Sequence, residues 1–200
     1  MSLIDYYIIE EQKVEEVKTM KTCETVYFEI EGESNTSNTL EAVKKALARV
    51  KVDAVIVAST TGETAAKAGE VLGNSIRIIG VPFQSDRQTK WGAPTTENVS
   101  KCKELGVELL PDEPKVLFID SERPDIVNAW RVVSRGFKVA LQCASMCVDT
   151  GLIPEGSTVI ALGGRIRGAD TAIVAEIYGY DKILKSSIKE IIALPKKSSS

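Results

Sequence analysis

The sequence predicts an α/β fold: a three-layer sandwich in which helices cover both faces of a mostly parallel, twisted sheet. Short apolar runs without polar alternation, such as residues 54–58 and 159–162, are typical of parallel strands buried on both faces. Helical segments separate most of these runs, and that alternation implies a parallel sheet with right-handed crossovers. The 200 residues are 44% hydrophobic and 26% charged, as expected of a globular chain that buries a sizeable core.

The first half of the chain alternates strands and helices. Each strand is predicted by aromatic and β-branched residues or by an unbroken apolar run, and each helix by an apolar stripe. The long polar loop at 83–94 interrupts this pattern, and loops of that length are often functional. In chain order, the sequence predicts a strand at 25–30, a helix at 40–50, a strand at 54–58, a helix at 63–72, a strand at 76–81 and a helix at 95–105.

The second half repeats the alternation and ends differently. Gly151 and Pro154 follow a nearly all-apolar helix, in agreement with helix-stop chemistry. The last segment alternates charged and apolar residues and is expected to pack as an edge element. The predicted elements are a strand at 115–119, helices at 125–133 and 136–150, strands at 157–162 and 171–177, and the edge element at 183–194.

No proline-, glycine- or serine-rich linker divides the chain. We therefore expect a single domain over residues 1–195, with residues 1–24 as an N-terminal arm and 196–200 as a flexible tail. No apolar run approaches the roughly 20 residues that cross a bilayer, and residues 1–10 lack the basic start of a secretory signal. These features predict a cytoplasmic protein without a membrane partner.

Charge and residue content exclude several classes of function. The net charge of −3 is spread along the chain, so nucleic acid is not expected as a partner. The chain contains no histidine, which removes Ser-His and Cys-His nucleophile activation. Its four cysteines form no CxxC pair, so no metal site is predicted. Cys143 and Cys147, four residues apart on a predicted helix, are expected to be buried thiols.

The run Ser59-Thr60-Thr61-Gly62 stands between a buried strand and a helix. Ligands of open parallel sheets collect at such strand ends, where helix N-termini present unpaired amides to anions. The hydroxyls and the glycine suit a phosphate. A capping box, with Thr60 as N-cap and Glu63 three residues later, explains the same spacing without a ligand, and the spacing alone does not decide between them.

Three other segments are expected at the same edge of the sheet, since each follows a predicted strand. We expect Asp170 to orient a ribose or ribityl hydroxyl and Arg165 or Arg167 to complement a phosphate; a tightly packed turn with two solvated arginines is the alternative. The resulting binding residues are Asn35, Thr36, Ser59, Thr60, Thr61, Gly62, Glu63, Thr64, Phe83, Gln84, Ser85, Gly163, Gly164, Arg165, Gly168, Ala169, Asp170 and Thr171.

At these residues the chain resembles stand-alone proteins, found chiefly in archaea and bacteria, that are similar to the C-terminal α/β domain of pyruvate kinase. The resemblance covers about residues 25–195 and combines several motifs in one order. They are Asn35-Thr36 with Thr39-Leu40, the run 58–65 (ASTTGETA), Gly136 to Val139 with Met146, the run 149–154 (DTGLIP) and the run 168–172 (GADTA).

The resemblance implies a pyruvate kinase C-terminal-like fold and a phosphate site at Ser59 to Thr64, where pyruvate kinase grips a phosphate of its sugar-bisphosphate effector. It does not imply kinase activity, because the catalytic machinery belongs to a separate barrel of about 250 residues. The stand-alone relatives are associated with flavin mononucleotide (FMN), whose ring would need a wall such as Phe83 or Trp91. The chain departs from the family at Phe83-Gln84-Ser85, where a histidine is expected, and at Gln142, where an acidic residue is expected.

Together these inferences favour a protein that binds a phosphorylated ligand, with FMN as the first candidate, and forms homo-oligomers. An FMN-dependent oxidoreductase is the first alternative, with the cofactor supplying the chemistry. Its possible participants are Cys143, Arg165, Asp170 and Lys90, although none is distinguished by spacing and the catalytic residues stay unknown. A structural or assembly module without a ligand is the second, with Ile8, Ile9, Val14 and Val17 available for contacts.

Overall fold

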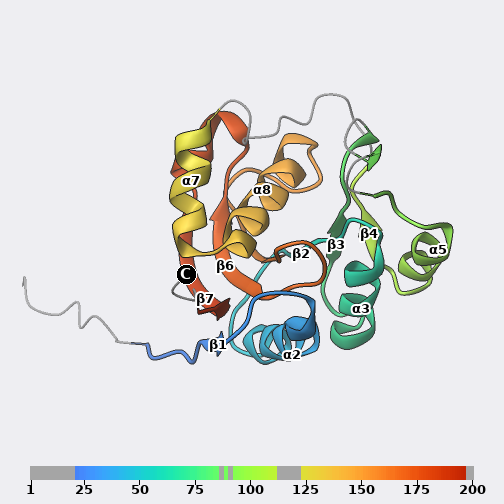
Figure 1. The fold of residues 1–200 in the computed structure, drawn as a ribbon, viewed down its shortest axis with the longest axis horizontal. Helices are drawn as coiled ribbons and strands as arrows, with labels where there is room; N and C mark the ends of the chain where they lie inside the picture. Colours follow the sequence, from blue (N-terminus) through green and yellow to red (C-terminus); the bar gives the residue numbers. More distant parts are fainter. Residues whose placement is uncertain (1–20, 86–87, 90–91, 112–122, 197–200) are drawn as a thin grey trace, which may run out of the picture.

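The structure is a computed structural model that describes residues 21–85, 88–89, 92–111 and 123–196. These residues form a seven-stranded sheet with the order β1-β7-β6-β5-β2-β3-β4 (Figure 1). Its strands are β1 (Val26–Phe28), β2 (Ala54–Ala58), β3 (Ile78–Val81), β4 (Glu108–Leu109), β5 (Ser157–Gly163), β6 (Thr171–Ile177) and β7 (Ser187–Pro195).

Five α-helices with complete described bounds and two short 3₁₀ helices connect the described strands. Residues 85, 88 and 89 are also helical, so the prediction of a loop throughout 83–94 was wrong there. Two of the α-helices begin with a side-chain cap: Thr95 accepts from the amide of Asn98, and Ser134 accepts from the amide of Phe137. The helices are α2 (Thr36–Leu47), α3 (Glu63–Leu72), α5 (Thr96–Glu104), α7 (Pro124–Val133) and α8 (Arg135–Asp149), with η1 (Glu33–Asn35) and η2 (Tyr180–Lys185) as the 3₁₀ helices.

The sheet is mixed, but most of its pairings are parallel. Strands β5, β2, β3 and β4 run in one direction, and β1 is parallel to β7. Only β6 runs against its neighbours, β5 and β7. The predicted α/β class with a mostly parallel sheet is therefore confirmed.

Two apolar clusters on opposite faces of the sheet give the molecule three layers. Along β2, Val55 and Val57 point into one cluster, which α2, α3 and α5 complete. Ala54 and Ile56 point into the other cluster, which is built mainly from α8 and flanked by α7. Because successive side chains of a strand point to opposite faces, the unbroken apolar run of β2 serves both clusters. Figure 1 shows the two groups of helices on either side of the sheet.

Most predicted elements are present, with shifts at their ends. The helices predicted at 125–133 and 136–150 each begin one residue earlier, and the strand predicted at 76–81 begins at Ile78, where its pairing with β2 starts. The two-residue strand β4 was not predicted. The strand predicted at 115–119 and most of the arm predicted at 1–24 lie outside the described residues.

The prediction of an edge element at 183–194 was wrong. Residues 180–185 form η2, and β7 then lies between β1 and β6, with β1 and β4 as the outer described strands. The charged residues that suggested an edge are paired instead: Lys189 lies 3.1 Å from Glu176, and Glu190 bonds to Arg49. An interior strand with one incompletely covered face tolerates charges that find such partners.

No helix among the described residues combines the length and the apolar character needed to cross a membrane.

Candidate functional site

Three loops follow neighbouring strands at the carboxyl-terminal ends of those strands, which together form one edge of the sheet. Val57 of β2 pairs with Leu162 of β5, and Ala58 pairs with Val81 of β3, all in parallel register. The turn after β2, the β5–β6 loop and the segment after β3 therefore start side by side. This edge is the position where ligands collect in open parallel sheets.

The turn after β2 is held tightly against α5. Gly62 has a φ of +87°, in the left-handed region, and a Cβ added there would lie 2.9 Å from Cβ of Asn98. The carbonyl of Thr61 accepts hydrogen bonds from the amide of Thr95 at 3.1 Å and from Nδ2 of Asn98 at 3.0 Å. Both the conformation and the space at position 62 thus require glycine.

At the start of helix α3, two backbone amides have no hydrogen-bond acceptor among the described residues. Oγ of the buried Ser59 accepts from the amide of Ala65 at 3.0 Å, and the carbonyl of Gly62 accepts from the amide of Ala66. The amides of Glu63 and Thr64 have no acceptor among the described residues. The first turn of α3 therefore presents donors together with the positive end of the helix dipole.

The capping-box alternative is wrong. The N-cap is Gly62, which makes no side-chain cap, and Glu63 is the first residue of α3. The Glu63 carboxylate instead forms an ion pair with Lys67 at 2.8 Å on the exposed side of the helix. The pKa of Glu63 is lowered, first by the hydrogen bond and charge of Lys67 and then, more weakly, by Arg167 and Lys101.

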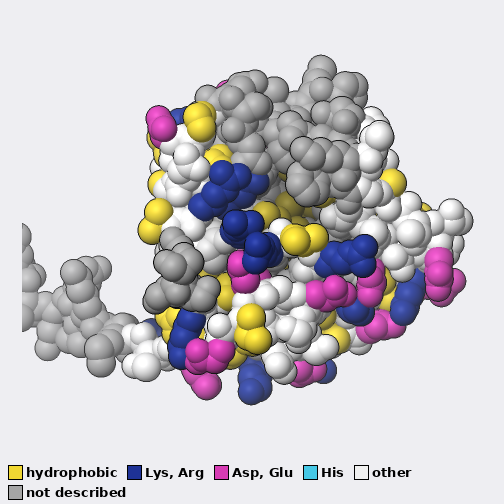
Figure 2. Space-filling model, viewed as in Figure 1, with side chains coloured by type: hydrophobic (Ala, Val, Ile, Leu, Met, Phe, Trp, Pro, Cys, Tyr) yellow, Lys and Arg dark blue, Asp and Glu magenta, His cyan; other side chains and the backbone are white. Residues whose placement is uncertain are grey.

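The β5–β6 loop brings basic side chains to the same edge. Arg165 forms an ion pair with Glu31 at 2.7 Å. Arg167 belongs to the same loop, which starts beside the turn after β2, and its charge contributes weakly to the lowered pKa of Glu63. No described residue forms an ion pair or hydrogen bond with Arg167. Figure 2 shows Lys and Arg side chains gathered across the middle of this face, over the region where Figure 1 draws the β5–β6 loop and the start of α8.

Asp170 ends this loop as a buried carboxylate with internal partners. It is 1% exposed, and its two oxygens accept from the amide of Gly32 at 2.8 Å and from the hydroxyl of Thr171 at 2.9 Å. The Thr171 hydroxyl also lies 3.0 Å from Oγ of Ser134, the cap of α8. The pKa of Asp170 is raised, first by burial, against the opposing hydrogen bonds of Thr171 and Gly32. In this structure Asp170 joins three segments of the chain.

Several predicted binding residues hold the loops together. Thr36 Oγ1 donates to the carbonyl of Glu33 and accepts from the amide of Ala169 at 3.1 Å. Asn35 Nδ2 donates to the carbonyl of Ile30. A Cβ at Gly163 would lie 2.2 Å from the carbonyl oxygen of Gly136, so this glycine permits the close approach of α8 to β5. Gly164 and Gly168 are similarly crowded, by backbone of the same loop and by Thr36 and Glu33.

The segment after β3 lies beside the turn after β2. Phe83 is half-buried, Gln84 is buried and Ser85 is exposed. A Cβ at Gly92 would lie 3.4 Å from Cγ2 of Thr60, so the end of the long loop returns to the turn. The predicted aromatic wall at Trp91 and the possible participant Lys90 lie outside the described residues.

The sequence reasoning missed residues that support the site through the backbone. Thr39 is 0% exposed and donates to the carbonyl of Ala169 at 3.1 Å, and the amide of Gly32 binds Asp170. Ser134 and Gly136 start α8 against Thr171. A hydrogen bond to the backbone leaves no pattern in the spacing of side chains. The only signal in the sequence that could have indicated the role of Thr39 was its closeness to Thr36.

Helix α8 contributes buried groups that are poor candidates for catalysis. Cys143 and Cys147 are buried as predicted; burial raises the pKa of the Cys143 thiol to about 12 and also raises that of Cys147. Both thiols are therefore protonated at neutral pH. Nε2 of the buried Gln142 has no hydrogen-bond partner among the described residues. No group of three or more possible metal ligands occurs in the described part of the chain.

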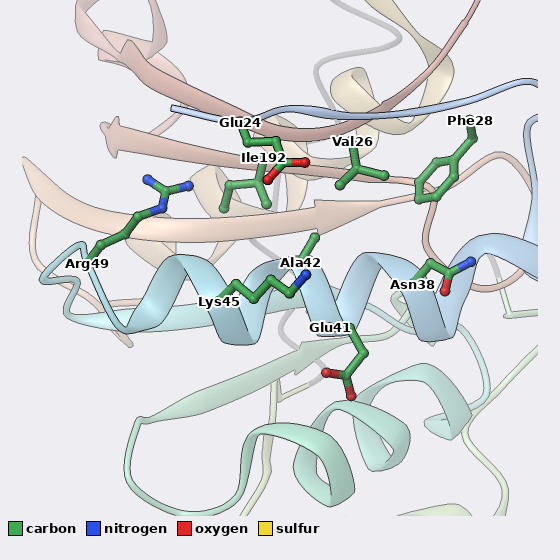
Figure 3. Close-up of a pocket in the computed structure, with 9 residues that line it drawn as sticks. All are labelled: Glu24, Val26, Phe28, Asn38, Glu41, Ala42, Lys45, Arg49 and Ile192. Carbon is green, nitrogen blue, oxygen red and sulfur yellow. The ribbon is translucent and has the colours of Figure 1, made fainter. Parts of the chain in front are cut away.

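The larger of two surface hollows lies away from the turn after β2. It encloses about 410 Å³ between α2 and strands β1 and β7. Figure 3 shows Val26, Phe28 and Ile192 on the sheet side, above Ala42 of α2, with Arg49 at one end. Arg49 is already paired with Glu190. The smaller hollow, about 280 Å³, lies at the sheet edge and is lined by residues 31–33 and 165–167.

A search of known protein-family models found none that matches this chain.

Proposed function

We propose that this protein binds a small phosphorylated ligand, with the phosphate at the start of α3, and that FMN is the first candidate. The observation that carries the proposal is the pair of amides, of Glu63 and Thr64, without a described acceptor. They follow Gly62, whose left-handed conformation allows the tight turn that presents these amides at the helix N-terminus. Thr60 and Thr61, both half-buried, supply hydroxyls from the same turn.

The charges around the turn support an anion rather than a cation. The Glu63 carboxylate, which would repel a phosphate, is engaged by Lys67 on the outer side of the helix. Arg167 lies on the neighbouring β5–β6 loop, within electrostatic range of Glu63, and has no ion-pair or hydrogen-bond partner among the described residues. A guanidinium opposite a helix N-terminus is a strong arrangement for phosphate, because both contribute hydrogen-bond donors and positive potential.

FMN follows from the resemblance described above, and one feature of the edge suits its ring. Ile166 is 72% exposed at the tip of the β5–β6 loop, and Phe83 begins the loop after β3. Both loops start beside the turn after β2. Binding is favoured over flavin-dependent catalysis because Cys143 is a protonated buried thiol and both oxygens of Asp170 have internal partners. Rapid reduction of bound flavin by NADH would reverse that preference.

The first test compares FMN with riboflavin, which has the same ring and ribityl chain but no phosphate. Each compound is titrated into the protein, after heat release and identification of anything that copurifies, and flavin fluorescence reports binding. We expect FMN to bind at least about tenfold more tightly, since charge-assisted hydrogen bonds are worth about 1.5–3 kcal/mol. Equal affinities would contradict the phosphate assignment.

The second test compares two glycines at the ends of α3. Gly62→Val places a side chain against Asn98 and forces the turn that presents the amides of Glu63 and Thr64 to shift, whereas Gly73→Val has open space. Both positions have positive φ, so both variants are strained; Gly73, with a ψ of −165°, lies in a region that only glycine normally adopts, so the control carries at least as much backbone strain as Gly62→Val. We expect only Gly62→Val to lose FMN and inorganic phosphate binding. Retained binding in a folded Gly62→Val protein would refute the site.

A further inference from the structure

The β5–β6 loop is fastened to the segment between β1 and α2 by a set of internal bonds. The amide and carbonyl of Ala169 bond to the hydroxyls of Thr36 and Thr39, both at 3.1 Å. A Cβ at Gly168 would lie 2.2 Å from Oγ1 of Thr36, so the backbones of the two segments are nearly in contact. The loop therefore cannot shift at residues 168–170 without breaking these bonds.

Asp170 is the charged member of this set. Its carboxylate reaches Gly32 with one oxygen and Thr171 with the other, and Thr171 continues to Ser134 at the start of α8. Bonds to a charged acceptor are stronger than neutral ones. Asp170 thus fixes the end of the loop against two other segments at once.

We propose that Asp170 is a positioning residue that acts through Arg167, holding the loop so that the Arg167 guanidinium faces the phosphate position at the start of α3. This inference rests on the proposed function. Arg167 is three residues from Asp170, and Gly168 and Ala169 between them are both packed against Thr36. Because this link is short and anchored, a shift of Asp170 also shifts the backbone of Arg167.

Direct contact between Asp170 and a ligand is the competing reading. Asp170 is 1% exposed, and both of its oxygens already accept hydrogen bonds. Arg167 is exposed and borders the 280 Å³ hollow at the sheet edge. The geometry therefore gives the contact to Arg167 and the support to Asp170.

A double-mutant cycle separates the two readings, with FMN as the probe. We expect Asp170→Ala to weaken FMN binding about tenfold when Arg167 is present, because the loop loses two bonds to a charged group. In an Arg167→Ala background the same substitution should have no further effect. Asp170→Asn should restore most of the affinity, since its amide oxygen can accept from Gly32 and its nitrogen can donate to Thr171.

Matched controls guard against a general loss of stability. Asp53→Asn alters another carboxylate that accepts a backbone amide, that of Thr158 at the opposite end of β5, and should leave FMN affinity unchanged. If Asp170→Ala does not fold, Thr39→Val releases the same loop through Ala169 and should show the same dependence on Arg167. Without any ligand, amide exchange at residues 163–170 should accelerate in Asp170→Ala or Thr39→Val and not in Arg167→Ala.

The outcomes distinguish the inference from the function on which it rests. If the native protein binds neither FMN nor phosphate, the proposed function fails and the inference fails with it. If the native protein binds FMN but Asp170→Ala costs the same factor in both backgrounds, or costs nothing, only the positioning role is overturned. Unchanged amide exchange in the loop would overturn it as well.

Discussion

Asp170 and Glu190 are both hydrogen-bonded carboxylates, yet their pKa values move in opposite directions. Burial dominates at Asp170 and raises its pKa. At Glu190 the hydrogen bond from Arg49 is the largest effect and lowers the pKa, with burial opposing it. One backbone amide and one hydroxyl compensate the buried charge of Asp170 less completely than a guanidinium compensates the charge of Glu190 nearer the surface.

The raised pKa of Asp170 predicts a specific dependence of stability on pH. A folded-state pKa above the unfolded value means that the folded state holds its proton more tightly. The contribution of Asp170 to stability is thus fully present below about pH 3.8 and is lost as pH rises through the folded pKa. We expect the free energy of unfolding of the native protein, relative to Asp170→Asn, to fall over that window. Urea unfolding at a series of pH values measures it, and a rising difference would contradict the assignment.

Glu190 predicts the opposite sign. Its lowered pKa contributes stability that is present above the unfolded value of about 4.5 and is lost as pH falls through the folded pKa. Glu190→Gln should lower the free energy of unfolding at pH 7 by less than about 1 kcal/mol, because the pair is partly exposed. The difference should shrink with added salt and vanish in acid, which thermal unfolding at several salt concentrations would show.

At the scale of elements, the close crossing of α8 over β5 depends on Gly163, and Gly136 of α8 likewise has no room for a side chain beside Asp170 and Thr171. A Cβ on Gly163 would meet the carbonyl oxygen of Gly136 at 2.2 Å and the amide nitrogen of Ala140 at 2.7 Å. Both obstacles are backbone atoms, so no side chain can rotate away. The same crossing places the capped start of α8 against Thr171.

Gly163→Ala should therefore destabilise the protein by about 1–3 kcal/mol or more, as expected when a packed contact is forced apart. The helix has to move away from β5, and the start of α8 moves with it. Chemical denaturation measures the loss, and amide exchange at the first turn of α8 should increase. An unchanged midpoint would show that α8 and β5 are not packed this closely.

Most elements could be predicted from the sequence, because the spacing of apolar residues along each element reflects which of its faces are buried. Strand β2 is apolar throughout, since both of its faces are covered. Helix α8 is apolar for the same reason. The interior place of β7 was not predictable, because its charges find partners on other segments: Glu190 pairs with Arg49, just after α2, and Lys189 pairs with Glu176 of β6. Strand β4, with two residues, is too short to form a pattern.

At the scale of the whole molecule, the two apolar layers make the four thiols differ widely in their accessibility to solvent. Cys102, Cys143 and Cys147 are buried, while Cys23 is half-buried near Arg49. We expect one thiol to react rapidly with a colorimetric thiol reagent in the native protein and all four to react in denaturant. Cys23→Ser should remove the rapid phase. Two or more rapid thiols would contradict the packing of α8 or α5.

The site was predictable at the level of loops and less so at the level of single side chains. Strand ends indicated which segments meet, and Ser59, Gly62, Arg165 and Asp170 all lie at that edge. Their individual roles depend on direction: whether Glu63 turns to a cap or to Lys67, and whether Asp170 turns inward. Spacing along a chain does not determine direction, because Glu63 has two candidate partners within one turn of helix, and the amide that holds Asp170, that of Gly32, lies over a hundred residues away.

The pairing of β1 with β7 has a consequence for synthesis on the ribosome. Val26 pairs with Ala193, so a strand near the start of the described chain finds its neighbour only when the last described strand emerges. Until then β1 exposes both of its edges, and β2 also lacks the partner that β5 later provides. Contacts so distant in sequence form slowly, and unpaired strand edges invite association between nascent chains. A stalled chain that ends before β7 should therefore bind chaperones more strongly than the released protein.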